Sequence, residues 1–229
     1  MDPALTGISS MATRDLLAAL AAAYRERSGV EVAIESVGGV DAARRVAAGE
    51  PFDLVVLAAD AIERLAAAGA VVSDSVSPLV RSEVAIAVRA GAPRPEVGSE
   101  AALKRAVLAA RRIGHSTGPS GSALLALFER WGLREALQPR TVQAPPGVPV
   151  GALVASGEVE LGFQQLSEMQ HLPGIAVLGT LPPEVAIVTV FSGAVATTSR
   201  QPQATRALLD HLRSPATAAI KRTHGMAPA

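Results

Sequence analysis

The chain has 229 residues, of which 49% are apolar and 18% are charged. This composition excludes a disordered chain, and the lack of a heptad or triplet repeat excludes a coiled coil and a collagen-like fibre. Lysine plus arginine and aspartate plus glutamate both number 21, so the net charge is zero and no nucleic-acid partner is expected. Cysteine is absent, which removes disulfides, iron–sulfur clusters, thiolate zinc sites and a cysteine nucleophile.

The N-terminal segment shows no export signal. Its second residue is acidic and no lysine or arginine precedes Arg14, whereas a signal peptide has a basic start and an apolar core. The longest purely apolar run, 16–24, is shorter than the roughly 18 to 20 residues that span a bilayer. We therefore expect a cytoplasmic protein without membrane insertion. A periplasmic location is the alternative if the sequence is that of a trimmed mature protein.

The first third of the chain repeats a strand, a turn of small residues and a helix three times. The expected strands lie at 5–8, 30–37 and 52–57. The first helix is capped by Ser10 or Thr13 and ends at Gly29, and the third is capped by Asp60. The second and third helices are expected near 41–48 and 61–68. This alternation is typical of a parallel sheet covered by helices.

The rest of the chain also alternates between strand and helix patterns. Segments rich in proline and glycine, 92–95 and 144–149, are interpreted as surface connections. The sequence therefore predicts an α/β protein throughout. The expected strands are 84–88, 159–163 and 185–191, and the expected helices are 101–110 with Ser99 as its cap, 123–131, 150–156, 202–212 and 215–223.

Three turns are candidates for ligand binding, because ligands of parallel sheets bind where strands end and helices begin. They are Ser9–Ala12, Gly38–Val40 and Ser116–Ser122. Each places free backbone N–H groups at the positive end of a helix dipole, and two of them add hydroxyls, which suits an anion. The alternative is that these serines and threonines are ordinary N-caps and these glycines ordinary turn formers.

Four motifs, in their order and at their intervals, resemble those of the molybdate-type periplasmic solute-binding proteins. They are GISSM at 7–11, AGEPFDLV at 48–55 with AAD at 58–60, STGPSG at 116–121 and VASGEVELG at 154–162. The resemblance covers nearly the whole chain. It implies a two-lobed periplasmic-binding-protein-like fold, with each lobe a small, mostly parallel sheet flanked by helices, two crossover strands, and the ligand in the cleft between the lobes. Lobe 1 would comprise 1–81 plus 192–229, and lobe 2 would comprise 82–191.

The sequence departs from the molybdate pattern at two places. The family normally offers a serine where Gly39 or Val40 stands, and a tyrosine near an aspartate where this chain has Phe163, Gln164 and Gln165. Glutamine both donates and accepts hydrogen bonds, which suits a carboxylate or carbonyl better than a compact tetrahedral metal oxyanion. Alternatively, the two amides point to solvent.

Two further side chains are candidates for chemistry. Arg81, at the expected crossover, could clamp a carboxylate or form a surface ion pair with Glu83. His115 could carry a proton or make a structural hydrogen bond. The other histidines do not have metal-ligand spacing, and 118–122 contains neither a phosphate-loop lysine nor a Gly-x-Ser-x-Gly elbow. No metal and no cofactor are therefore expected.

The resemblance implies binding of a small oxyanion or carboxylate, with an ABC permease as partner only if the chain is exported. The same superfamily includes aconitate isomerase, so the alternative is a cytoplasmic, cofactor-independent isomerase of a small unsaturated polycarboxylate that uses Arg81 and His115. A third possibility is a ligand sensor. The expected ligand-binding residues are Ser9, Ser10, Met11, Gly38, Gly39, Val40, Arg81, Thr117, Ser120, Gly121, Gln164 and Gln165.

Overall fold

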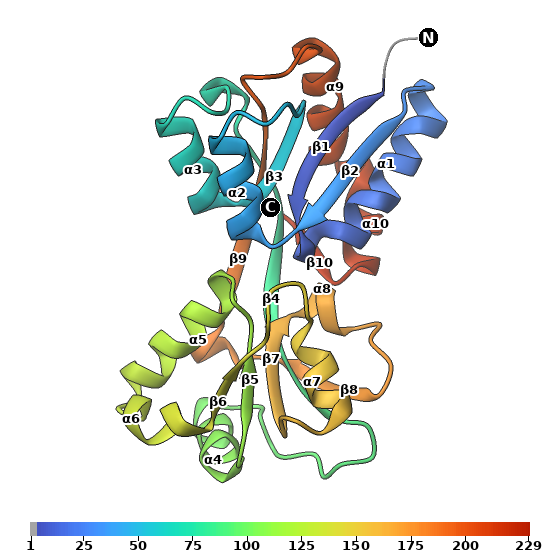
Figure 1. Ribbon diagram of the computed structural model, residues 1–229. Coiled ribbons are helices and arrows are strands. Elements are labelled where there is room, and N and C mark those ends of the chain that lie inside the picture. Colours follow the sequence, from blue (N-terminus) through green and yellow to red (C-terminus); the bar gives the residue numbers. More distant parts are fainter. Residues whose placement is uncertain (1–3) are drawn as a thin grey trace. The chain divides into compact units, whose positions relative to one another are not determined.

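The chain forms two compact units in the computed structural model, which describes residues 4–229 (Figure 1). Unit 1 comprises the residues up to Arg81 together with Val190–Ala229, and unit 2 comprises Ser82–Thr189. The chain passes from one unit to the other within two strands, β4 (Ser77–Arg89) and β9 (Val188–Val195). Unit 1 is therefore discontinuous, and the chain returns to it at residue 190, where we expected 192.

Unit 1 is built on a sheet with the strand order β2-β1-β3-β9, in which the first three strands are parallel and β9 is antiparallel. The register places Ser9 of β1 beside Ser36 of β2 and Val56 of β3. The carboxyl ends of these three strands therefore meet at one edge of the sheet. The strand bounds are β1 (Leu5–Ser10), β2 (Val32–Val37), β3 (Leu54–Ala58) and β10 (Met226–Pro228), which pairs with β4.

Helices cover both faces of this sheet because its central strands are apolar on both sides. Leu54 and Val56 of β3 join the core beneath α1 and α9, whereas Val55 and Leu57 join the core beneath α2 and α3. Figure 1 shows α2 and α3 on one side of the sheet and α1, α9 and α10 on the other. The bounds are α1 (Arg14–Ser28), α2 (Gly39–Ala47), α3 (Ala59–Ala67), α9 (Pro202–Arg213) and α10 (Ala218–Thr223), with 3-10 turns η1 (Met11–Thr13), η2 (Ser73–Ser75) and η5 (Pro215–Thr217).

A buried carboxylate joins three segments of unit 1. Asp53, which is 6% exposed, accepts hydrogen bonds from the backbone N–H and the hydroxyl of Thr6 at 2.9 and 3.1 Å. It also accepts one from the hydroxyl of Ser199 at 2.7 Å. Burial by itself disfavours the charged form, but these donors outweigh it and hold the pKa of Asp53 below its usual range. The charged carboxylate thus ties β1 to β3 and to the segment after β9.

Unit 2 is built on a sheet with the strand order β4-β7-β5-β6, and β8 pairs antiparallel with β4. β5 is parallel to β6 and β7, and its register places His115 beside Gln143 and Phe163. The carboxyl ends of these three strands therefore share one edge. The strand bounds are β5 (Ile113–His115), β6 (Thr141–Gln143), β7 (Leu161–Gln165) and β8 (Ile175–Thr180).

This second sheet is also covered on both faces, and the predicted α/β class is confirmed. Val84 and Ile86 of β4 face the core formed with α4 and α5, whereas Ala85 and Ala87 face the core formed with α7. The smaller alanines leave room for α7 to pack closely on its side of the sheet. The bounds are α4 (Glu100–Ala109), α5 (Pro119–Arg130), α6 (Arg134–Leu137), α7 (Val150–Ser156) and α8 (Leu166–Met169), with 3-10 turns η3 (Gln138–Arg140) and η4 (Pro183–Val185).

Several element ends differ from the predictions, and two differences affect candidate residues. α5 begins at Pro119, not near 123, because proline fits the first position of a helix, so Ser120 and Gly121 lie in its first turn. β7 extends to Gln165, beyond the expected end at 163, because its last residues pair with β4. Asp60 lies in the first turn of α3 and is not its cap, which is Ala58.

Other local predictions are confirmed. Gly29 ends α1 with a φ of 75°, which is the left-handed conformation that glycine adopts without strain. The Ser99 hydroxyl accepts a hydrogen bond from the N–H of Ala102 and caps α4. None of the helices described for residues 4–229 is both long enough and apolar enough to cross a membrane.

Candidate functional site

The parallel strand edge of unit 1 brings two of the predicted turns together. The hydroxyls of Ser9 and Ser36 lie 2.8 Å apart and are hydrogen-bonded. A Cβ built on Gly39 would lie 3.6 Å from the Cβ of Ser10, so the turn after β1 contacts the turn after β2. Parallel pairing produces this contact, because β1 and β2 are in register up to their last residues.

Ser9 and Ser10 are both buried but differ in their hydrogen bonds. Ser9 is fully buried, and its hydroxyl is hydrogen-bonded to the hydroxyl of Ser36. Ser10 is 7% exposed, and within the described part of the chain its hydroxyl has no hydrogen-bond partner. A buried hydroxyl without a partner costs about 1–3 kcal/mol, so a bound ligand that pairs with it would recover this cost. Ser10 is therefore the stronger ligand-binding candidate of the two.

α2 begins beside Ser10. Its N-cap is Gly38, and within residues 4–229 no side chain caps this N-terminus. The first backbone N–H groups of the helix, from Gly39 and Val40 onward, are therefore free to bind an anion. The Val40 side chain is 74% exposed, and Met11 on the neighbouring turn is partly exposed. In unit 1 the structure thus places Ser10, Met11 and the Gly38–Val40 turn together.

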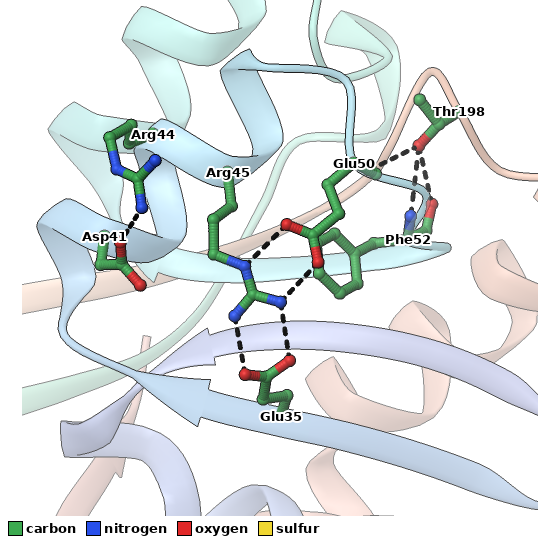
Figure 2. Close-up of polar contacts among 7 residues, drawn as sticks. All are labelled: Glu35, Asp41, Arg44, Arg45, Glu50, Phe52 and Thr198. Carbon is green, nitrogen blue, oxygen red and sulfur yellow. Dashed lines mark hydrogen bonds and ion pairs between the residues drawn. The ribbon is translucent and has the colours of Figure 1, made fainter.

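A network of charges holds α2 against the sheet (Figure 2). Arg45 of α2 donates two hydrogen bonds, at 2.7 and 2.8 Å, to the carboxylate of Glu35 on β2, and it also binds Glu50. Its guanidinium lies 5.4 Å from the centre of the Phe52 ring. These contacts raise the pKa of Arg45 and lower the pKa values of both glutamates. The sequence analysis missed this network, which fixes the orientation of the helix whose N-terminus faces the strand edge.

The strand edge of unit 2 carries the third predicted turn. The Ser116 and Ser120 hydroxyls are hydrogen-bonded to each other at 2.9 Å. A Cβ built on Gly121 would lie 1.9 Å from the carbonyl oxygen of Ser116 and 3.1 Å from Nδ1 of His115. Only glycine can therefore occupy position 121. Thr117 is exposed, and Ser120 is 5% exposed.

His115 is held in one tautomer by the same turn. Its Nδ1 lies 3.0 Å from the Ser116 carbonyl oxygen. Because a carbonyl oxygen can only accept, Nδ1 carries a proton, and in the neutral imidazole Nε2 then carries the lone pair. Among the residues from 4 to 229, none is a hydrogen-bond partner of Nε2. The imidazole is thus oriented as a general base, although it is only 5% exposed.

The two neighbouring glutamines at the end of β7 have different roles. Gln164 uses both ends of its amide: Oε1 accepts from the N–H of Val150 at 2.7 Å, and Nε2 donates to Glu168 at 2.8 Å. It therefore caps α7. Gln165 donates to the hydroxyl of Thr189 at 2.7 Å, and its Oε1 has no partner in the described residues. Both amides are buried, so the alternative that they point to solvent is wrong.

The Gln165 amide can present either a donor or an acceptor to a ligand. Its partner Thr189 carries a hydroxyl, which donates or accepts equally well. With the amide rotated by 180°, the Thr189 hydroxyl donates to Oε1, and the NH₂ group becomes free to bind a carboxylate. Gln165 thus keeps its structural hydrogen bond while it binds a ligand.

Two residues of β4, Arg81 and Ser82, are further candidates for ligand binding. Arg81 is exposed and has no hydrogen-bond or ion-pair partner within residues 4–229, so the alternative pairing with Glu83 is wrong. Ser82 is fully buried, and its hydroxyl is unpartnered in the described part of the chain. Sequence analysis missed Ser82, because a serine inside an apolar strand gives no local signal of its environment. Residues 4–229 contain no cluster of acidic and histidine side chains that could hold a metal ion.

Comparisons with known proteins agree on the fold. Residues 5–227 match the family described as bacterial extracellular solute-binding protein. The chain is 37% identical over 230 residues to an aconitate isomerase from a Pseudomonas species, which covers 98% of this chain and 87% of the relative.

Two solved structures are similar along nearly the whole chain. The periplasmic molybdate-binding protein of Azotobacter vinelandii has a TM-score of 0.80 and 20% identity, covering 97% of this chain and 98% of that one. The sulfate-binding protein of Mycobacterium tuberculosis H37Rv has a TM-score of 0.80 and 19% identity, covering 99% and 87%. At these identities the similarity confirms the predicted fold.

Proposed function

Because the chain belongs to the bacterial extracellular solute-binding protein family, we propose that it binds a small polycarboxylate and catalyses the isomerisation of aconitate. The observation that carries this proposal is the 37% identity to an aconitate isomerase along 98% of the chain. That identity is nearly twice the 20% shared with the molybdate-binding protein. The proposal also accounts for Gln165, since an amide suits a carboxylate better than a compact metal oxyanion.

The reaction is a proton shift that needs no cofactor. A base removes a proton from the methylene carbon of aconitate, the double bond moves by one position, and the proton is returned to the former vinylic carbon. The new double bond forms along the former single bond to the methylene carbon, so the conformation of that arm when its proton is removed decides whether the product is the cis or the trans isomer. The catalyst must stabilise that carbanion, and hydrogen-bond donors to the flanking carboxylates do so.

In unit 2, His115 is the proposed proton carrier. Its Nδ1–H donates to the Ser116 carbonyl, so in the neutral imidazole the lone pair lies on Nε2, which has no hydrogen-bond partner in the described residues. The Thr117 hydroxyl, the Gln165 amide and the backbone N–H of Ser120 in the first turn of α5 supply donors for a carboxylate. Gly121 keeps the helix close enough to the Ser116 carbonyl to hold the imidazole in this orientation.

Unit 1 and its boundary supply a second set of carboxylate-binding groups. Ser10 contributes a buried hydroxyl, and α2 contributes free N–H groups at Gly39 and Val40. Arg81 contributes an exposed guanidinium that can bind a carboxylate through two hydrogen bonds. Each of these groups of unit 1 can bind a carboxylate.

A second candidate function is that of a receptor for an inorganic oxyanion. It is supported by the similarity to molybdate-binding and sulfate-binding proteins over nearly the full length of the chain. The free N–H groups at the start of α2 suit such ligands as well. This function requires export of the chain and an ABC permease as partner, whereas isomerisation requires no permease.

Proton NMR in deuterium oxide tests the proposal. Purified protein is incubated with trans-aconitate, and we expect cis-aconitate signals to appear together with deuterium at the exchanging carbon. His115→Gln should lower the rate by about 10²–10⁴-fold, the usual contribution of a general base. His171→Gln, at an exposed position on another segment, is the matched control and should leave the rate unchanged.

Two results would contradict the proposal. No isomerisation and no deuterium uptake, combined with calorimetric binding of molybdate or sulfate, would establish the receptor function instead. An active His115→Gln variant would assign the proton transfer to another group while leaving the isomerase activity itself in place.

A further inference from the structure

Unit 1 carries a pocket of about 550 Å³ that is separate from its strand edge. Its walls come from the beginning of β4, the end of α9, η5, α10 and β10, and all of these except η5 are labelled in Figure 1. None of the candidate ligand-binding residues described above lines it. Its volume falls within the range of about 300–1,000 Å³ that is usual for small-molecule sites.

Lys221 of α10 lines this pocket and is 1% exposed. It has no hydrogen-bond or ion-pair partner anywhere in residues 4–229. Lysine is almost never fully buried unless it is paired, because an ammonium group without a partner loses its hydration and gains nothing in return. Burial accordingly lowers the pKa of Lys221. The fold buries this ammonium group without providing a negatively charged partner for it, so we expect such a partner to be a ligand.

The other charged residues of the pocket leave this lysine uncompensated. Asp210 is the acidic residue of the lining, and it forms an ion pair at 2.9 Å with Arg213, which also lines the pocket. Both are more than half exposed, at 65% and 58% of their side chains, so this pair lies toward solvent. The pair is neutral overall, and it leaves Lys221 without an ion-pair partner among the described residues.

The remaining walls indicate what kind of anion fits. Pro78, Pro215 and Pro228 line the pocket with rigid apolar surface. The Ser214 hydroxyl accepts a hydrogen bond from the N–H of Ala216, so its own proton is available to a ligand. A ligand with one carboxylate and an apolar body would satisfy Lys221 and the prolines together.

We propose that this pocket is a second ligand site, which binds a small organic monocarboxylate through an ion pair with Lys221. The site is independent of the proposed isomerase function, because its lining shares no residue with the strand edges. The bound carboxylate forms the ion pair that Lys221 otherwise lacks, and this ion pair is largely shielded from water.

Calorimetric titration with hexanoate tests the proposal, with the uncharged analogue hexanol as the parallel titrant. We expect one hexanoate site in the wild type. Lys221→Met removes the charge but keeps the apolar stem, and should weaken hexanoate binding by about thirtyfold or more while leaving hexanol unaffected. The chain has one other lysine, Lys104 of unit 2, so Lys104→Met is the matched control and should bind hexanoate as the wild type does.

A second measurement does not depend on the Lys221 variant folding. In protein with ¹³C-labelled lysine and the Lys104→Met substitution, a single Cε resonance reports on Lys221, and hexanoate should shift it. The proposal is overturned if this resonance does not move, if the wild type does not bind hexanoate, or if Lys221→Met binds it equally well. Aconitate isomerisation by Lys221→Met should remain at the wild-type rate, which separates failure of this site from failure of the proposed activity.

Discussion

Replacing Gly121 by alanine tests how α5 positions His115. The added methyl group would lie 1.9 Å from the Ser116 carbonyl oxygen, whereas real contacts of this kind stay beyond 3.0 Å. The oxygen belongs to the backbone at the end of β5, so it cannot rotate away as a side chain would. Either the start of α5 or the Ser116 peptide must therefore move by about 1 Å.

The expected cost follows from two opposing effects. Alanine in a helix is favoured over glycine by about 1 kcal/mol, so the substitution should be stabilising if no clash existed. Overpacking against a rigid neighbour costs about 1–3 kcal/mol or more, and here the neighbour is backbone. We expect a net loss of about 2 kcal/mol, or about 4–8 °C in melting temperature for a chain of this size. A displacement of about 1 Å at the base should also lower the isomerisation rate by about 10²-fold.

The assay compares Gly121→Ala with Gly118→Ala by circular dichroism melting and by aconitate turnover. Gly118 lies in the same turn, but nothing lies within 4 Å of a Cβ built there, so the second variant adds the same methyl group to open space. Loss of glycine at the N-cap should cost Gly118→Ala at most about 1 kcal/mol. If Gly121→Ala melts no lower than Gly118→Ala and turns over aconitate as fast, the packing that we describe around His115 is wrong.

Three further substitutions test unit 1. For Asp53→Asn we expect a loss of about 2 kcal/mol in unfolding free energy at pH 7. Because the folded-state pKa of Asp53 is lowered, this difference in urea unfolding should close as the pH falls below about 4, and a constant difference would contradict the role of its charge. Ser10→Ala should weaken carboxylate binding by about fivefold in calorimetry with little change in melting temperature, whereas a clear destabilisation would make its hydroxyl structural. Arg45→Met should lower the melting temperature more than Arg44→Met, since Arg45 binds two glutamates and Arg44 a single aspartate, and equal melting temperatures would argue against the network.

The sequence by itself determined the class of fold and the order of its elements. Alternating apolar residues, small-residue turns and helical spacing are local properties, and each can be read within a window of a few residues. Gly29 and Ser99 end and begin their helices as expected because capping depends on the same short range. The turns after β1, β2 and β5 could be identified as candidates for the same reason.

Only the tertiary structure decided which residue of each adjacent pair is available to a ligand. Ser9 and Ser10 are identical in type, yet Ser9 is occupied by Ser36, 27 residues away, whereas Ser10 has no partner in the described chain. Both ends of the Gln164 amide are hydrogen-bonded, and this residue caps α7. Gln165 donates to Thr189, 24 residues away, and its Oε1 has no partner in the described chain.

The same distinction applies to Lys221, which belongs to an ordinary short helical pattern and yet is almost completely buried. Its burial depends on β4, α9 and β10, which the chain brings around it only in the folded state. The physical reason is general: the local sequence sets the periodicity of a segment, but the partner of a buried polar group comes from a distant segment, and a polar group is satisfied or left free only after both have packed.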